Sequence, residues 1–152
     1  MILVAGIGNI FLGDDAFGSE VARRLAARPQ PDGVRVVDFG IRGLDLVYAL
    51  LDDNAAVILI DAAARGGEPG TLYVIAPDIP DDPTAAIQTH EMDPAHVLAV
   101  ARQMGASLRN VRVVGCEPET LQEEHIGLSE RVGEAVDGAV RIVESLIQEA
   151  LV

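Results

Sequence analysis

Residues 2–18 read ILVAGIGNIFLGDDAFG, and this stretch decides the fold. Its first six residues form a short apolar run, which predicts a buried β-strand. A turn built from Gly6, Gly8 and Asn9 follows, and the adjacent acids Asp14 and Asp15 then precede an apolar pattern with helical spacing. Ligands of open α/β sheets bind outside the carboxyl ends of the strands. We therefore expect this turn to form one wall of a functional site.

The rest of the chain continues this alternation of strands and helices. Apolar runs predict further strands at residues 34–39, 56–60, 71–75 and 111–115, and helical spacing predicts helices at residues 17–28, 44–51, 94–104 and 129–147. The link before the fourth strand is too short to hold a helix, so this strand is expected to pair antiparallel. The pattern predicts a three-layer α/β/α sandwich with a twisted, mostly parallel, mixed five-stranded sheet. We expect a single domain spanning residues 1–152.

Capping residues predict where two of the helices begin. Asp14 or Asp15 is expected to cap the first helix, because a carboxylate accepts hydrogen bonds from the free N–H groups of a first turn. Asp93 followed by Pro94 predicts the start of the third helix. Within that helix, Met104 is expected to lie on the buried face.

The composition limits the classes of function. The chain has 11 Lys and Arg residues against 24 Asp and Glu residues, giving a formal net charge of −13. This charge argues against binding to nucleic acid, whose phosphate backbone requires a basic surface. No apolar run approaches the roughly 20 residues of a membrane span, and no basic region precedes the first apolar run as it would in a signal peptide. The single cysteine, Cys116, fits a reducing compartment, so we expect a cytoplasmic protein.

Two acids and a histidine form the main candidate site. Asp15 follows the first strand and Asp61 ends the third, and the carboxyl ends of parallel strands share one edge of the sheet. His90 lies in a polar stretch before the third helix. Such a set can bind nickel, zinc, iron or manganese and leave positions open for a substrate. Simpler roles compete with this interpretation: a helix cap for Asp15, a capping contact for Asp61 and a surface position for His90.

Two other features of the sequence are candidate sites. The glycine turn matches the start of a dinucleotide fingerprint, and Asp38 ends the second strand where a ribose-binding acid would be expected. However, Phe11 occupies the third glycine position of that fingerprint. Cys116 is followed by Glu117, whose charge raises the pKa of a thiol, so we expect a small buried or half-buried residue and not a nucleophile.

Taken together and in order, the motifs of this chain resemble those of the hydrogenase maturation endopeptidases. The resemblance covers nearly the whole chain, and the ordered set is more specific than any one motif. The matching motifs are GIGN at residues 6–9 with Asp14, Asp15 and Gly18, GIRGLDL at residues 40–46, VILIDA at residues 57–62, GEPG at residues 67–70, His90, and GCEP at residues 115–118.

The resemblance implies an activity, a partner and a ligand set. Members of this family, assigned as aspartic-type proteases, remove a C-terminal extension from the large-subunit precursor of a nickel–iron hydrogenase after nickel insertion. It implies that Asp15, Asp61 and His90 are both the catalytic residues and the nickel ligands, with the nickel supplied by the precursor. The implied fold is the α/β/α sandwich predicted above. Metal activation of water and general-base catalysis by a carboxylate both stay open.

Two functions of other classes remain as alternatives. The first is a nucleotide- or dinucleotide-binding domain built on the glycine turn. The second is a chaperone that holds a hydrogenase precursor without cleaving it. Saturable binding of a dinucleotide would favour the first, and complex formation without shortening of the precursor would favour the second.

Overall fold

The computed structural model describes residues 1–82, 93–119, 121 and 126–152. All of the predicted strands and helices are present, with small shifts at their ends. In chain order the elements are β1 (Ile2–Ile7), the 3-10 helix η1 (Gly13–Ala16), α1 (Phe17–Ala26), β2 (Val34–Gly40), α2 (Gly43–Leu51), β3 (Ala56–Ala62), β4 (Leu72–Ile75), α3 (Pro94–Gln103), β5 (Val111–Cys116) and α4 (Glu130–Leu151).

The five strands form one mixed sheet in the order β2-β1-β3-β5-β4. Strands β2, β1, β3 and β5 are parallel, whereas β4 pairs antiparallel with β5, as the short link before it predicts. Gly6 of β1 lies opposite both Asp38 of β2 and Ile60 of β3. The carboxyl ends of these three strands therefore meet at one edge of the sheet.

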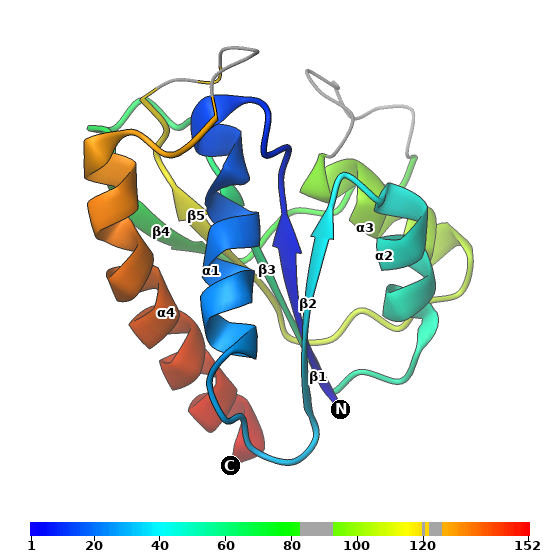
Figure 1. Ribbon diagram of the computed structural model, residues 1–152. Coiled ribbons are helices and arrows are strands. Elements are labelled where there is room, and N and C mark those ends of the chain that lie inside the picture. Colours follow the sequence, from blue (N-terminus) through cyan, green and yellow to red (C-terminus); the bar gives the residue numbers. More distant parts are fainter. Residues whose placement is uncertain (83–92, 120, 122–125) are drawn as a thin grey trace.

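Helices cover both faces of the sheet, so the predicted three-layer α/β/α architecture is confirmed (Figure 1). Along β3, Val57 and Leu59 pack in one core cluster with α2 and α3, while Ile58 and Ile60 pack in the other with α1 and α4. This alternation follows from the two-residue period of side chains along a strand. None of the helices in the described part of the chain has both the length and the apolar character needed to cross a bilayer.

The first turn of α1 lies directly against the ends of β1 and β3, and glycine makes this approach feasible. A Cβ atom added at Gly18 would collide with the carbonyl oxygens of Ile7 and Ile60. A Cβ atom at Gly6 would collide in turn with the carbonyl oxygen of Gly18 and with the Ala22 side chain. The absence of side chains at both glycines therefore fixes how closely the helix approaches the sheet.

Two predicted details are wrong. Met104, expected on the buried face of α3, is 51% exposed, because the helix ends before it. Neither Asp14 nor Asp15 caps α1: its N-cap residue is Ala16, and among the described residues no side chain caps this end. The 3-10 helix η1 lies between strand and helix, so the two acids are placed ahead of α1. The predicted cap of α3 is confirmed, since the Asp93 carboxylate accepts a hydrogen bond of 3.0 Å from the N–H two residues on.

Replacing Gly18 by alanine should destabilise the fold. The added methyl group meets backbone atoms that cannot rotate away, and overpacking of this kind costs about 1–3 kcal/mol. Gly133→Ala in α4 is the matched control, since a Cβ atom there meets no described atom within 4 Å. This control should instead gain roughly 0.5–1 kcal/mol from its higher helix propensity. Denaturant unfolding of both variants measures the difference, and equal stability of the two would contradict the packing argument.

Candidate active site

Asp15 lies in η1, immediately beyond the carboxyl end of β1. The chain reaches it through a tight turn at Gly8, whose φ of +151° lies in the region that favours glycine. A Cβ atom at Gly8 would also collide with the carbonyl oxygen of Asp15. The Asp15 side chain is 5% exposed, and its Oδ2 accepts a hydrogen bond of 3.0 Å from the Asn9 N–H. The glycine turn thus brings this carboxylate to the sheet edge and orients it.

Asp61 is buried near the end of β3, where it is only 3% exposed. Its Oδ1 accepts a hydrogen bond of 2.9 Å from the Ala62 N–H. Burial raises the pKa of the Asp61 carboxyl well above its ordinary value, and the negative charges of Asp15 and, less strongly, Asp93 raise it further. The Ala62 N–H opposes these effects but is outweighed. The structure therefore brings two of the three predicted site residues into electrostatic contact.

Each of the two carboxylates keeps one oxygen available. Within the described residues, Oδ1 of Asp15 and Oδ2 of Asp61 accept no hydrogen bond from the chain. The capping contact weighed for Asp61 is real, but it occupies one oxygen only. His90, the third predicted residue, lies outside the described residues. Among residues 1–82, 93–119, 121 and 126–152, no group of three or more His, Cys, Asp or Glu side chains has the geometry to hold a metal ion.

Asp14 is a buried anchor that the sequence did not predict. It is fully buried, with its Oδ2 accepting hydrogen bonds of 2.8 Å from the Glu119 N–H and from the Ser129 hydroxyl. Its Oδ1 accepts a third, of 2.7 Å, from the Ser129 N–H. These bonds fasten η1, which carries Asp15, to the chain after β5 and to the residue that precedes α4. The sequence shows the adjacent acids Asp14 and Asp15. It does not indicate that Asp14 binds residues more than 100 positions further along the chain.

Glu117 is a second buried anchor, placed directly after β5. Its Oε1 accepts hydrogen bonds from the Arg65 N–H at 2.8 Å, the Gly67 N–H at 3.0 Å and the Tyr73 hydroxyl at 2.7 Å. The Tyr73 hydrogen bond and the backbone bonds lower the pKa of the Glu117 carboxyl, while the same bond to Glu117 raises the pKa of Tyr73. Glu117 thereby fixes the loop that leaves β3 immediately after Asp61.

A cleft opens beside Asp61, between the loop after β3 and the start of α3. It has a volume of about 500 Å³, within the range of ligand-binding sites. Asp78 and Asp93 line it together with Asp61, and Arg65 is the one cationic side chain among its described lining residues. The cleft could hold a substrate segment next to the acid pair.

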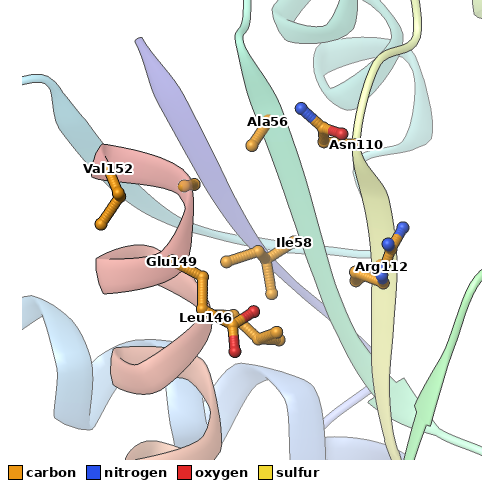
Figure 2. A pocket seen from close by; sticks show the side chains of 8 residues that line it. Ala56, Ile58, Asn110, Arg112, Leu146, Glu149 and Val152 are labelled. Atoms are coloured by element: carbon orange, nitrogen blue, oxygen red, sulfur yellow. The ribbon is translucent and has the colours of Figure 1, made fainter.

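A separate hollow of about 300 Å³ lies at the opposite edge of the sheet (Figure 2). It is bounded by the first residues of β3, the start of β5 and the last turns of α4. Ala56 and Ile58 line it, whereas Asp61 lies at the other end of the same strand. This hollow is therefore not part of the candidate active site.

The other candidate residues are engaged or buried. The Asp38 carboxylate accepts hydrogen bonds from the Gly40 N–H and the Arg23 guanidinium, so neither oxygen is free for a ribose. Cys116 is fully buried, and burial, followed by the charges of Asp14 and Glu117, raises the pKa of its thiol to about 12. The expectation that Cys116 is buried and is not a nucleophile agrees with this environment.

Comparison with known proteins identifies the family. A family model for hydrogenase maturation proteases matches residues 19–146. The hydrogenase 2 maturation protease of Escherichia coli strain K12 is 31% identical over 151 residues, covering 98% of this chain and 92% of that protein. The structure of the hydrogenase maturating endopeptidase HybD from E. coli superposes with a TM-score of 0.81 at 30% identity, covering 98% of this chain and 93% of the other. For a hydrogenase 2 maturation peptidase from a Thaumarchaeota archaeon the TM-score is 0.73 at 32% identity, covering 97% of each chain.

These matches and the fold define a peptidase of hydrogenase maturation. The chain belongs to the hydrogenase maturation protease family. The resemblance read from the ordered sequence motifs is thereby confirmed, as is the predicted mixed α/β fold.

Replacing Asp14 by alanine should destabilise the protein on the order of 3 kcal/mol, because three partly buried donors lose their buried, charged acceptor. Ser129→Ala removes only the hydroxyl bond and should cost about 1.5 kcal/mol. Ser107→Ala, which alters an exposed hydroxyl, should stay within about 0.5 kcal/mol of wild type. Urea unfolding measures the free energy of unfolding of the three variants. An Asp14→Ala protein as stable as wild type would contradict the anchoring role of Asp14.

Cys116 should resist alkylation in the folded protein. At pH 8 its thiolate fraction should be about a thousandfold lower than that of a free thiol, because the pKa rises by three units, from 9.0 to about 12. Raising the pH towards 10 should increase the rate about tenfold per pH unit while the fold persists. Mass spectrometry after iodoacetamide treatment, with the urea-unfolded chain as control, follows the reaction. Rapid alkylation of the native protein at pH 8 would contradict the conclusion that the Cys116 thiol is buried and has a raised pKa.

Proposed function

We propose that this protein is the endopeptidase that removes the C-terminal extension of a nickel–iron hydrogenase large-subunit precursor after nickel insertion. Asp15, Asp61 and His90 would read the inserted nickel and form the catalytic set of an aspartic-type protease. The nickel belongs to the precursor and is not a resident cofactor of this chain. The reaction would take place in the cytoplasm, where the single thiol of Cys116 fits the reducing environment.

The observation that supports this proposal is the buried acid pair. Asp15 and Asp61 repel each other across a site where burial already penalises their charges. A divalent cation at their available oxygens would relieve both penalties, and carboxylate and imidazole ligands suit nickel among the first-row metals. The backbone N–H groups that hold the other oxygens keep both carboxylates oriented before the cation arrives.

The pair also suits peptide hydrolysis. A carboxylate held beside the scissile bond can act as general base towards an attacking water. Asp61 could therefore take the proton of an attacking water, while the nickel carried by the precursor would polarise the scissile carbonyl. The cleft beside Asp61 would hold the peptide on one side of the bond to be cut.

Asp15→Asn, Asp61→Asn and His90→Ala should each slow cleavage of nickel-loaded precursor by roughly 100-fold or more, since each removes a ligand or a proton-transfer group. Asp52→Asn, an exposed carboxylate at the far edge of the sheet, should cleave like wild type. Wild-type protein should leave nickel-free precursor uncut. Gel-shift assays of precursor shortening measure all of these rates.

The outcomes separate this proposal from its alternatives. Equal cleavage of loaded and nickel-free precursor by wild type and variants would refute nickel reading. Stable binding of precursor without any shortening would instead indicate a chaperone. Saturable binding of NAD in a titration would favour a dinucleotide-binding domain.

A further inference from the structure

We propose that Arg65 is a specificity-determining residue that binds a carboxylate of the precursor segment lying in the cleft beside Asp61. This inference rests on the proposed function, because it assumes that the cleft receives a peptide. It adds a binding role to a loop to which neither the sequence motifs nor the family match assigns one.

Arg65 combines the lack of an ion pair with a place in the acidic cleft, whereas Arg109, Arg112 and Arg141, which also form no ion pair within the described residues, do not line that cleft. Ion pairs of 4.0 Å or less engage Arg23, Arg24, Arg28, Arg35, Arg42, Arg102 and Arg131. Within the described residues, Arg65 forms none, although three carboxylates line the same cleft. The side chain is exposed, so an incoming group can reach it.

Neighbouring residues contact Arg65 at its backbone N–H and at its guanidinium. Its backbone N–H donates to Glu117 Oε1 at 2.8 Å, and its guanidinium carbon lies 5.7 Å from the centre of the Tyr73 ring. The Tyr73 hydroxyl donates to the same Glu117 oxygen at 2.7 Å. An arginine already held against an aromatic ring loses less conformational entropy on binding a carboxylate than a free arginine does. The contact with Tyr73 therefore preorganises Arg65 for binding.

Within the described residues no nearby acid forms an ion pair of 4.0 Å or less with Arg65, although the charge of Arg65 contributes to lowering the pKa of Glu117. Glu117 already accepts three hydrogen bonds on Oε1 and is 6% exposed. Asp93 accepts the capping bond at the start of α3, and Asp61 accepts one from Ala62. The rest of the cleft repels an anion, so a carboxylate of the bound segment is favoured at Arg65 alone. The guanidinium fork, which can bind a carboxylate through two parallel hydrogen bonds, would therefore fix the register of the peptide.

Two sources could supply this carboxylate. One is an Asp or Glu side chain in the precursor segment beyond the scissile bond. The other is the terminal carboxylate of the precursor itself. Both present the same planar group to the guanidinium, and variants of the precursor can tell them apart.

The test measures cleavage of nickel-loaded precursor by Arg65→Gln, with Arg109→Gln, an exposed arginine far from the cleft, as matched control. Arg65→Gln should raise KM about 10- to 100-fold, the value of a charge-assisted hydrogen bond, and leave kcat within about twofold. Tyr73→Phe keeps the ring but removes its hydroxyl bond, and should raise KM by a smaller factor. Thermal unfolding confirms that each variant is folded.

Precursor variants then identify the ligand. Neutralising the Asp or Glu that Arg65 binds should raise KM for wild type but not raise it further for Arg65→Gln. If the terminal carboxylate is bound, lengthening the precursor by several glycines should show this pattern instead. In the side-chain case, Arg65→Glu should recover activity on a precursor carrying Lys at the identified position.

The failures are distinguishable. If wild type does not cleave the precursor, the proposed function itself fails. If wild type cleaves and Arg65→Gln behaves like Arg109→Gln, only the role of Arg65 is overturned. An increase in KM that couples to neither source of carboxylate, or a decrease in KM, would also overturn it.

Discussion

The close contact between the first turn of α1 and the carbonyl ends of β1 and β3 is the constraint on which the candidate site depends. Gly6 and Gly18 allow it, because any side chain at either position would meet backbone or a neighbouring side chain. Gly8 likewise allows the tight turn that carries Asp15, because a Cβ atom there would collide with the Asp15 carbonyl oxygen. The structural role of these glycines is therefore close packing. They let the helix come near enough for a carboxylate from η1 to face the end of β3.

Buried carboxylates serve two different purposes around this contact. Asp14 accepts hydrogen bonds on both carboxylate oxygens, and Glu117 accepts three on Oε1, so each acts as an anchor for a loop that borders the site. Asp15 and Asp61 each accept one hydrogen bond from the described residues, and each has a second oxygen that accepts none from them. The number of hydrogen bonds that each acid accepts therefore differs, from three at Asp14 and Glu117 to one at Asp15 and Asp61, a difference that residue type alone does not reveal.

The charged residues of the cleft, more than the net charge of the protein, determine which groups can bind there. A net charge of −13 describes the molecule as a whole, whereas binding depends on the few charges that line the cleft. The cleft lies beside the acid pair, of which Asp61 lines it, and Arg65, contacted by Tyr73, is the cationic side chain among its described lining residues. A substrate that carries a metal at one end and a carboxylate at the other would meet both features in a single orientation.

The sequence by itself determined the strands, helices, their order and the family, because apolar periodicity and short motifs are local properties of the chain. It also predicted that Asp15 and Asp61 lie at one edge of the sheet, since strand ends in a parallel sheet share an edge. Only the tertiary structure decided which acids are anchors and how Arg65 is held. The partners of Asp14 lie 105 and 115 residues away, and those of Glu117 lie 44 to 52 residues away. Contacts at such separations arise from packing, and no local spacing encodes them.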